Sequence, residues 1–504
     1  MAELEERPFP PGDYPVVVVG SGPGGLQASY YLRHLGIDHA LISADPSPGG
    51  MFRQFPFFQR LLSWTKPYAP VERDHRFYYW YDWNSLLAEE PGNRAIMPDL
   101  MDGTSSFPSR PEMENNLAEY VSRTGLQVRY GCRWEGTRRD GEQFVLETSD
   151  GEYRCQAAVF AVGVAEPLKP DTPGFDLVPH YADTQPPENY AGKRLFIVGK
   201  ENSGFELATG LLQWAQRIVL ASPRPTKLSV NTHSLLGVRA RYVLPVEDEI
   251  LGGGVFILNA SISRIERLGA SYRVHCIRSE GGMEISVDAD EVIAATGFTC
   301  PLLDLPKLGV DVFGRSGLPA MTNYWESASV PGLYFAGTIG QGVAGMKKYG
   351  MPANSGAVHG ARYNARTMIG QLASSKFGVQ QERPTIAPDR LLDLLLTEAT
   401  EAPELWNQKS YLARAFSLNP DEGIRDDGIV PLAHFVDEEG DAAVAITVET
   451  DDTGDIHPAV YVRAQGRPAQ ETLLASHPLH DFRTGDNRAQ LSQLLRGVTS
   501  GAVR

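Results

Sequence analysis

Cysteine is scarce in this chain of 504 residues, and the four cysteines stand far apart at positions 132, 155, 276 and 300. No Cys-x-x-Cys pair occurs, and no group of cysteines and histidines has the spacing of a zinc site. The sequence therefore predicts no bound metal and argues against a dithiol redox motif. Unpaired, scattered cysteines are typical of a cytoplasmic protein with reduced thiols.

Long apolar runs and an excess of basic residues are also absent. No run approaches the roughly 20 residues that a membrane helix needs. The first fifteen residues lack both a basic start and an apolar stretch, so we expect no secretory signal. The net charge of −16 argues against nucleic-acid binding, which needs clustered Lys and Arg. We expect a cytoplasmic protein that binds neither a membrane nor a nucleic acid.

Short apolar runs that end just before a glycine or a Thr-Gly pair are frequent instead. Five of them cover residues 16–19, 159–162, 196–198, 293–295 and 333–336. Runs of this length without alternation are typical of buried parallel strands, and open α/β sheets bind ligands at the carboxyl ends of such strands. The sequence thus predicts an α/β fold with several strand ends facing cofactors.

Two of these runs are followed by a helical pattern, and about 180 residues separate them. This spacing predicts two Rossmann-like dinucleotide-binding domains, with the second inserted into the first. The predicted boundaries are 1–165 and 290–379 for the first domain and 166–289 for the second. Residues 380–504 form a C-terminal α+β segment with a helical pattern at 390–402, two β-like runs at 442–448 and 459–462, and no motif that assigns a role.

The first dinucleotide motif follows the run at 16–19 and reads Gly20-Ser21-Gly22-Pro23-Gly24-Gly25. Gly20 permits the tight turn, Gly22 lets the backbone approach a pyrophosphate, and Gly25 lets the helix pack on the strand. After the second strand an acidic residue is expected to hold ribose hydroxyls. Ser43 occupies that place and Asp45 follows, so Asp45 is either the ribose contact or a turn residue before Pro46.

Three further stretches, Pro48-Gly49-Gly50-Met51-Phe52, Ala294-Ala-Thr296-Gly297-Phe298 and Ala336-Gly337-Thr338, carry a family resemblance. The chain resembles the two-dinucleotide flavoproteins, which include flavin-containing monooxygenases and thioredoxin-reductase-like enzymes. The resemblance implies that Gly49, Gly50 and Met51 abut FAD, and that Thr296-Gly297 links the domains. It also implies that Gly337-Thr338 contacts the ribityl chain, with Thr338 replacing an aspartate. A helix expected from Ala353 would direct its positive end at the flavin, and Lys347 or Lys348 could add charge there.

The second motif reads Gly199-Lys-Glu201-Asn202-Ser203-Gly204 and resembles the family's Gly-x-Gly-Asn-Ser-Gly except at Glu201. A carboxylate beside a pyrophosphate is repulsive, so nicotinamide binding is expected to be weakened, shifted or lost unless the Glu201 side chain turns to solvent. Arg224 and Lys227 follow the next strand. They are either ordinary loop cations or the site of a 2′-phosphate, which favours NADPH over NADH.

Twelve of the 32 residues from Phe52 to Trp83 are aromatic, which predicts either core or the wall of a pocket for a substrate with an apolar or aromatic part. Asn84 falls where flavin-containing monooxygenases keep an active-site asparagine, with a turn or capping role as the alternative. His180 is the other catalytic candidate. The monooxygenase fingerprint around it is not reproduced, because Gly174 and His180 are six residues apart rather than four.

The stretches Tyr81–Leu87, Asn202-Ser203, Asn231-Thr-His233 and Gly356–Tyr363 look most like the FAD-dependent oxidoreductase-domain proteins typified by the endoplasmic-reticulum flavoprotein associated with degradation. A bacterial relative is expected. The family resemblance implies an NADPH-using monooxygenase that oxygenates a nitrogen, sulfur or ketone of a small substrate through a peroxyflavin. An FAD oxidase or dehydrogenase with a weak nicotinamide site and a flavin-stabilised partner protein are the alternatives.

Overall fold

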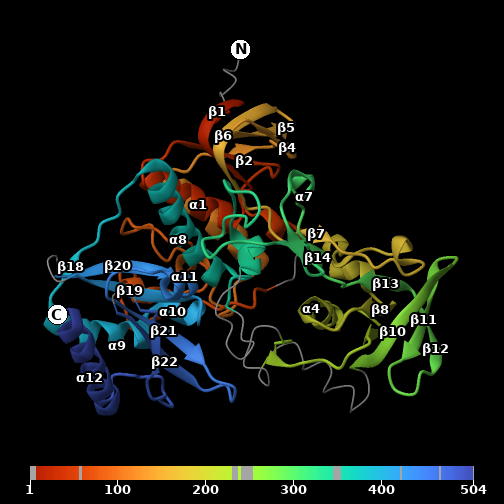
Figure 1. Cartoon of the computed structure of the whole chain (residues 1–504). Coiled ribbons are helices and arrows are strands. Elements are labelled where there is room, and N and C mark those ends of the chain that lie inside the picture. Colours follow the sequence, from red (N-terminus) through yellow and green to blue (C-terminus); the bar gives the residue numbers. More distant parts are fainter. Residues whose placement is uncertain are drawn as a thin grey trace.

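The structure is a computed structural model that describes residues 7–55, 60–229, 237–239, 254–343, 353–419, 423–464 and 467–502. Outside these ranges lie Lys347 and Lys348, which were predicted to add charge near the flavin, and residues 231–233, which carry part of the family resemblance. The chain forms three units: a first dinucleotide domain, a second dinucleotide domain to its right, and a C-terminal domain to its lower left (Figure 1).

The first domain is built on a mixed sheet in the order β3-β2-β1-β6, where β6 pairs with both β5 and β17. Strands β3, β2, β1, β6 and β17 are parallel, and β4, β5 and β6 form an antiparallel meander. The strands are β1 (Gly12–Val19), β2 (His39–Ser43), β3 (Arg129–Tyr130), β4 (Trp134–Asp140), β5 (Gln143–Thr148), β6 (Gly151–Phe160) and β17 (Leu333–Phe335). Residues 16–18 at the centre are wholly buried, as the sequence predicted for an unalternated apolar run.

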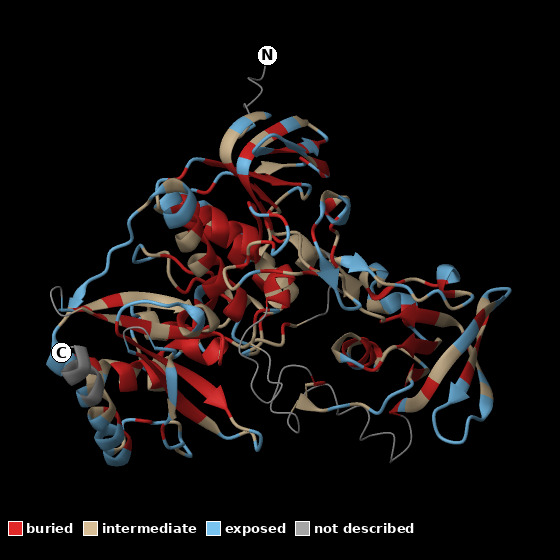
Figure 2. Cartoon of the chain, in the orientation of Figure 1, coloured by how far each residue is buried: buried red, intermediate tan, exposed pale blue. Residues whose placement is uncertain are grey.

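Two long helices, α1 and α8, pack together beside this sheet and contain much of the buried core (Figures 1 and 2). The helices of this domain are α1 (Pro23–His34), α2 (Met97–Leu100), α3 (Arg110–Thr124), α7 (Leu305–Leu308) and α8 (Val358–Phe377), with 3₁₀ turns η1 (Gly50–Gln54), η2 (Arg76–Trp80) and η8 (Gly337–Gly342). A small ribbon of β15 (Val312–Phe313) and β16 (Leu318–Pro319) precedes β17. Helix α1 begins at a proline, whose fixed φ suits the first helical position.

The expected start of the last helix at Ala353 is wrong: α8 begins at Val358, with Ala357 as its N-cap in extended conformation. Residues 353–357 form a turn instead, in which the Ala357 N–H bonds to the Asn354 carbonyl. At Gly356 a Cβ would lie 2.9 Å from Gln341 Oε1, so this turn is packed closely against η8.

The second domain repeats this plan in a sheet of order β12-β11-β10-β9-β8-β13. The parallel strands β13, β8, β9 and the first part of β10 adjoin an antiparallel meander of β10, β11 and β12. Its elements are β8 (Arg194–Val198), α4 (Asn202–Leu211), β9 (Arg217–Ser222), β10 (Val255–Leu268), β11 (Ser271–Arg278), β12 (Glu284–Ala289) and β13 (Glu291–Ala294), preceded by η3 (Phe175–Leu177), η4 (Tyr181–Asp183) and η5 (Pro187–Tyr190).

The predicted boundary at residues 289 and 290 falls inside this domain and needs correction. Strand β13 lies beyond that boundary but pairs in parallel with β8, so the second sheet is complete only at Ala294. The physical link between the domains is a two-stranded ribbon in which β7 (Glu166–Pro167) pairs antiparallel with β14 (Phe298–Thr299). The five glycine-terminated runs all end parallel strands, as predicted.

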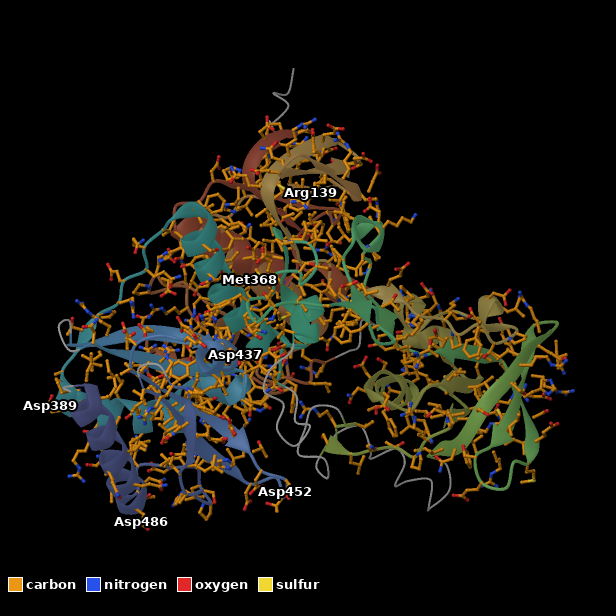
Figure 3. All side chains as sticks on the ribbon, viewed as in Figure 1. Arg139, Met368, Asp389, Asp437, Asp452 and Asp486 are labelled. Atoms are coloured by element: carbon orange, nitrogen blue, oxygen red, sulfur yellow. The ribbon has the colours of Figure 1, made fainter. Side chains whose placement is uncertain are left out.

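The C-terminal domain is an antiparallel sheet in the order β18-β20-β19-β21-β22-β23. Its elements are β18 (Thr385–Ile386), η10 (Pro388–Arg390), α9 (Leu391–Glu401), α10 (Pro403–Asn407), β19 (Leu412–Asn419), β20 (Gly423–Pro431), α11 (Leu432–Asp437), β21 (Ala443–Thr450), β22 (Ile456–Arg463), β23 (Gln470–Leu473) and α12 (Gly485–Ala502). The predicted helix at 390–402 and the β-like runs at 442–448 and 459–462 correspond to α9, β21 and β22. Exposed acidic residues, including Asp389, Asp437, Asp452 and Asp486, are spread over this domain (Figure 3).

Across the described ranges, no helix combines the length and apolarity required to cross a membrane. The same ranges contain no group of three or more His, Cys, Asp or Glu side chains arranged to hold a metal ion.

Candidate functional site

The loop between β1 and α1 requires glycine at two of its three motif positions and leaves open space at the third. Gly20 has φ +107°, and a Cβ there would lie 2.6 Å from the Ala161 carbonyl oxygen. A Cβ on Gly25 would lie 1.8 Å from the Gly20 carbonyl oxygen, so this glycine allows α1 to pack against the strand. A Cβ on Gly22 would meet nothing within 4 Å. Gly22 therefore faces open space at the start of a helix, the arrangement that accommodates an anion.

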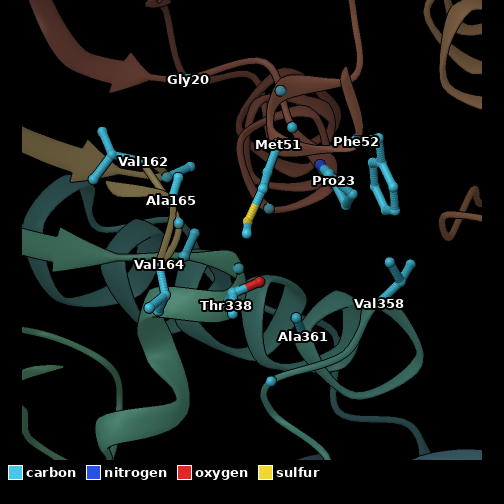
Figure 4. Close-up of a pocket in the computed structure, with 18 of the residues that line it drawn as sticks. Gly20, Pro23, Met51, Phe52, Val162, Val164, Ala165, Thr338, Val358 and Ala361 are labelled. Atoms are coloured by element: carbon cyan, nitrogen blue, oxygen red, sulfur yellow. The ribbon is translucent and has the colours of Figure 1, made fainter. Parts of the chain in front are cut away.

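That open space is a cavity of about 730 Å³ at the carboxyl ends of the first-domain strands, within the usual range for ligand pockets of roughly 300–1,000 Å³. Met51 and Phe52 lie on the side of α1, whereas Thr338, Val358 and Ala361 lie on the side of η8 and α8 (Figure 4). Of the predicted cofactor residues, the lining includes Gly20, Ser21, Gly22, Pro23, Gly24, Asp45, Gly49, Gly50, Met51, Gly337 and Thr338.

Asp45 lies beside the glycine loop, at one end of the cavity. The Ser43 hydroxyl donates to Asp45 Oδ2 at 3.3 Å, and the Ser21 hydroxyl donates to Ser43 Oγ at 2.8 Å. A Cβ on Gly50 would lie 3.8 Å from Asp45 Oδ2 and 3.3 Å from the Gly22 Cα. The carboxylate therefore lies next to the backbone of both glycine loops, where it can reach the ribose of a dinucleotide.

The η8 turn closes the other side of the glycine loop. A Cβ on Gly24 would lie 2.5 Å from both the Cα and the nitrogen of Gly337, so these two backbones can approach only without side chains. Thr338 follows directly and faces the cavity (Figure 4). The sequence motifs at residues 20–25 and 337–338 are thus in direct contact and line the same cavity.

The start of α8 is held in place by the C-terminal domain. Gln408, wholly buried, donates through Nε2 to Ser355 Oγ at 3.0 Å, to Asn364 Oδ1 at 2.6 Å and to the Gly360 carbonyl at 3.2 Å. The Asn354 N–H also donates to the Asn407 carbonyl at 3.1 Å. The segment at 380–504, to which the sequence assigned no role, therefore supports the cavity wall.

Asn84 is buried but does not line the cavity. Its side-chain amide donates to Thr65 Oγ1 at 2.9 Å and to the Ser63 carbonyl at 3.2 Å. Its backbone N–H bonds to Asp82 Oδ1 at 3.0 Å. The amide thus braces the loop whose Ser63 lines the cavity, which corresponds to the alternative of a turn role rather than contact with a substrate.

His180 and Thr296-Gly297 lie at the junction of the two dinucleotide domains, outside the cavity lining. The His180 ring shares a hydrogen bond of 3.0 Å with the Gly297 carbonyl through Nε2, and Nδ1 accepts from the Ala182 N–H at 3.2 Å. These contacts fix a neutral ring with its proton on Nε2, and burial lowers the pKa of His180. The Thr296 hydroxyl donates to the Leu168 carbonyl. The three residues hold the link between the domains.

The loop of the second domain reproduces two of the three glycine contacts. Gly199 has φ +129°, with a Cβ position 2.2 Å from the Ala295 carbonyl oxygen, and a Cβ on Gly204 would lie 2.4 Å from the Gly199 carbonyl oxygen. These contacts match those of Gly20 and Gly25. Only the glycine that faces the ligand is replaced, by the exposed Glu201.

The first turn of α4 carries Asn202 and Ser203. Asn202 Oδ1 accepts from the Arg239 backbone N–H at 3.1 Å, and Asn202 Nδ2 donates to the Gly237 carbonyl at 3.4 Å. The side-chain amide that the sequence assigned to nicotinamide binding is therefore engaged by residues 237–239. Ser203 is half-buried beside it.

Arg224 and Lys227 are close enough to Glu201 to affect its ionisation. Partial burial raises the pKa of Glu201, while the positive charges of Arg224, Lys227 and Lys200 oppose that rise. Arg224 is exposed, so it remains accessible to a phosphate group.

Several residues of the cavity lining, Arg133 and Gln341 among them, were missed by the sequence motifs. His359, in the second position of α8, and Arg239, from the second domain, both line the cavity. His359 lies within the stretch that resembled a known family, but its role had no sequence signal. Arg239 belongs to no motif at all.

The four cysteines are all unpaired and buried, and none lines the cavity. Burial raises the pKa of Cys155 to about 12 and that of Cys276 and Cys300 to about 11, and it also raises that of Cys132. All four are therefore protonated near neutral pH and unsuited to attack a disulfide, which requires a thiolate.

Comparison with known proteins relates residues 17–337 to a family model described as pyridine nucleotide-disulphide oxidoreductase. The FAD-dependent oxidoreductase domain-containing protein 2 of Danio rerio is 27% identical over 440 residues, which cover 76% of this chain and 62% of that protein. The chain thus spans less than two thirds of that relative. A probable indole-3-pyruvate monooxygenase of Arabidopsis thaliana is 23% identical over 65% of this chain and 85% of its own.

Solved structures show the same fold in the two dinucleotide domains. A flavin-containing monooxygenase from Stenotrophomonas maltophilia matches with a TM-score of 0.54 and 22% identity, over 72% of this chain and 98% of its own. A bacillithiol disulfide reductase from Staphylococcus aureus matches with a TM-score of 0.56 and 16% identity, over 72% and 99%.

Proposed function

Because the chain belongs to the pyridine nucleotide-disulphide oxidoreductase family, we propose that it is an FAD-dependent, NADPH-using monooxygenase. Its substrate is a small organic molecule with an apolar or aromatic part. The observation that carries this proposal is the first-domain cavity, in which a dinucleotide cradle continues into an apolar chamber without a thiol.

The residues present fit FAD. Gly22 leaves room at the start of α1 for the pyrophosphate, Asp45 and Ser43 supply polar groups for the ribose, and Thr338 supplies a hydroxyl for the ribityl chain. The first N–H groups of α8 would hold the ring, since the positive end of a helix favours negative charge. When bound there, FAD supplies two-electron redox chemistry and reactivity with O₂.

The chemistry of the cavity wall favours oxygen transfer over disulfide reduction. Disulfide reduction needs an accessible thiolate near the flavin, and the cysteines of this chain are buried, protonated and outside the cavity lining. Apolar side chains such as Leu61, Leu62 and Phe52 line the cavity instead. Such a wall excludes water, and exclusion of water prevents hydrolysis of a reactive oxygenating group before it reacts with the substrate.

The second domain supplies the nicotinamide site in this proposal. Glu201 adds one negative charge where a pyrophosphate would lie, but Arg224, Lys227 and Lys200 surround it with positive charge. The exposed side chain can turn to solvent, so the backbone cradle of Gly199 and Gly204 stays available. Exposed Arg224 favours NADPH over NADH through the 2′-phosphate.

The overall reaction balances as NADPH, a proton, O₂ and substrate giving NADP⁺, water and the oxygenated substrate. Anaerobic mixing of the holoprotein with NADPH or NADH, followed by O₂, tests it by flavin absorbance and product mass. We expect faster bleaching with NADPH and incorporation of one labelled oxygen atom from O₂ into the product. Absence of bleaching by either nucleotide would refute the proposal.

One observation favours a second candidate, an FAD oxidase or dehydrogenase that takes hydride from its substrate. The Asn202 amide bonds to residues 237 and 239, and this contact must coexist with or yield to a nicotinamide. The same experiment separates the candidates, because an oxidase is bleached by substrate alone and then releases hydrogen peroxide without oxygenating the product.

A further inference from the structure

A group of cavity residues near the start of α8 carries polar chemistry that the FAD contacts leave unused. We call the region lined by Leu61, Leu62, Ser63, Arg239 and His359 the α8 chamber. The His359 ring packs on Trp83 at 4.6 Å between centroids, and Trp83 packs on Trp64 at 4.4 Å. These contacts place residues 61–64 and the start of α8 side by side.

His359 is the most unusual side chain of the chamber. It is 1% exposed, and neither ring nitrogen has a hydrogen-bond partner among the residues that the structure describes. Burying polar groups without hydrogen-bond partners is unfavourable. Burial, with the positive charges of Arg362, Arg239 and Lys409, holds the pKa of His359 well below its usual value. The ring is therefore neutral and offers one N–H donor and one acceptor to a ligand.

Arg239 reaches this chamber from the second domain, and a specific contact places it there. Asn202, in the first turn of α4, accepts through Oδ1 from the Arg239 backbone N–H at 3.1 Å and donates through Nδ2 to the Gly237 carbonyl at 3.4 Å. The backbone N–H of Val238, between them, donates to the Lys227 carbonyl at 2.8 Å, and the Val238 carbonyl accepts from the Ser229 N–H at 2.9 Å. Residues 237–239 are thus hydrogen-bonded both to α4 and to residues 227–229. The positively charged Arg239 lines the first-domain cavity.

The positive charges of Arg362, Arg239 and Lys409 act on His359. Arg362 donates to the Ser85 carbonyl at 2.7 Å and Lys409 donates to the Trp406 carbonyl at 2.9 Å, so both bond to neutral groups. Within the described residues, neither forms an ion pair with a carboxylate. Asp45, the acidic residue of the lining, lies beside Gly22 and Gly50 rather than in the chamber. In a chain of net charge −16, the chamber is a local positive region with apolar walls.

From these contacts we propose that the α8 chamber binds an organic carboxylate with an apolar or aromatic body. Arg239 binds the carboxylate, His359 donates one further hydrogen bond, and Leu61 and Leu62 contact the body. An arginine fork matches a carboxylate in bidentate geometry. The carboxylate is the substrate of the proposed oxidoreductase, so the inference rests on that proposed function.

Equilibrium binding of benzoate and benzamide to the oxidised holoprotein, followed by flavin absorbance, tests the proposal. The two probes share a body and differ in charge. We expect benzoate to bind about tenfold more tightly, a difference of about 1.4 kcal/mol. Arg239→Gln should remove this preference, and Arg239→Lys should keep part of it. Arg278→Gln, which alters an exposed arginine of β11 in the same domain, should keep all of it.

Two outcomes would overturn the proposal. The first is equal binding of the two probes to the unmodified protein. The second is a benzoate preference that survives Arg239→Gln while the flavin reduction potential falls, which would assign the positive charge to the reduced flavin instead. If Arg239→Gln loses FAD, Asn202→Ala is the second variant, because it removes the hydrogen bonds that hold residues 237–239. It should weaken the binding of benzoate more than that of benzamide. Because the assay uses neither NADPH nor O₂, its failure leaves the monooxygenase test untouched, and the converse also holds.

Discussion

At the scale of single residues, the two dinucleotide loops differ at the position that faces the ligand. Gly22 leaves open space, whereas Glu201 places a side chain at the corresponding turn. The flanking glycines make matching backbone contacts in both loops, because those contacts serve the packing of helix on strand. We therefore expect the difference to affect ligand affinity and not the fold.

Glu201→Gly should strengthen NADPH binding about tenfold, since it removes a repulsive carboxylate worth about 1–2 kcal/mol near a pyrophosphate. Titration of the holoprotein with NADP⁺ by calorimetry measures the change. Glu201→Gln serves as the control that keeps the side-chain volume without the charge. If Glu201→Gly binds NADP⁺ no better than the unmodified protein, the carboxylate does not weaken the site.

At the scale of elements, the start of α8 depends on α10 and the residue after it. Gln408 makes three hydrogen bonds to the turn and helix that wall the cavity, and Tyr411 donates to the Val343 carbonyl nearby. The C-terminal domain thus fixes an element that the first domain contributes to the site.

Gln408→Leu should destabilise the protein by about 2–4 kcal/mol, because Ser355 and Asn364 lose a buried partner. It should also speed FAD release, since the first turn of α8 loosens. Thermal unfolding and the rise of free-flavin fluorescence measure the two effects. Gln490→Leu, whose amide makes an exposed bond to the Leu473 carbonyl, is the control and should change neither. Unchanged FAD release in Gln408→Leu would contradict this role.

Sequence reasoning succeeded where an element is defined by its own residues. The strand ends before Gly20 and Gly199 follow from local apolar runs and glycine motifs. No sequence pattern predicted β20, which carries the charged residues Arg425, Asp426 and Asp427. Arg414 of β19 forms an ion pair with Asp426 across the strands, and Arg383, which precedes β18, pairs with Asp427, so charged partners accompany this polar stretch in the sheet. Arg239 could not be found either, because it belongs to no motif and is held at the cavity by hydrogen bonds between Asn202 and residues 237 and 239, which are distant in sequence.

At the scale of the whole molecule, an ion cluster around the buried carboxylates of Glu398 and Glu404 joins the first domain to the C-terminal domain. Arg76 of η2 bonds to Glu398 at 2.6 Å and to Glu404 at 2.9 Å, and Arg366 of α8 bonds to Glu404 at 2.9 Å. Burial opposes the ionisation of Glu404, but the charges of Arg76 and Arg366 outweigh it and hold its pKa well below the usual range. The cluster is therefore charged at neutral pH.

Glu404→Gln should destabilise the protein by about 1.5–3 kcal/mol, because Arg366 loses its carboxylate partner and Arg76 keeps only Glu398. Since the folded pKa of Glu404 is depressed, its contribution is present above the unfolded value of about 4.3 and is lost as the pH falls further. Urea unfolding between neutral pH and pH 3 measures both effects.

The Glu404→Gln variant should consequently show a shallower loss of stability in acid than the unmodified protein. Glu119→Gln, in the partly exposed i,i+4 pair with Arg123 on α3, is the control and should have little effect. A Glu404→Gln variant as stable as the unmodified protein at neutral pH would contradict a stabilising role for this charge.

The pairing of β6 with β17 sets an order for the synthesis of the chain. Ala158 and Leu333 are neighbours in the first sheet, yet the entire second domain lies between them in the sequence. Closing so long a loop costs roughly 4–5 kcal/mol of entropy. A second domain that folds early would bring its own ends together at the β7–β14 ribbon and lower that cost. The first domain is then the first to be synthesised but the later one to complete its folding. Its cofactor cradle closes only after residue 338 has emerged from the ribosome.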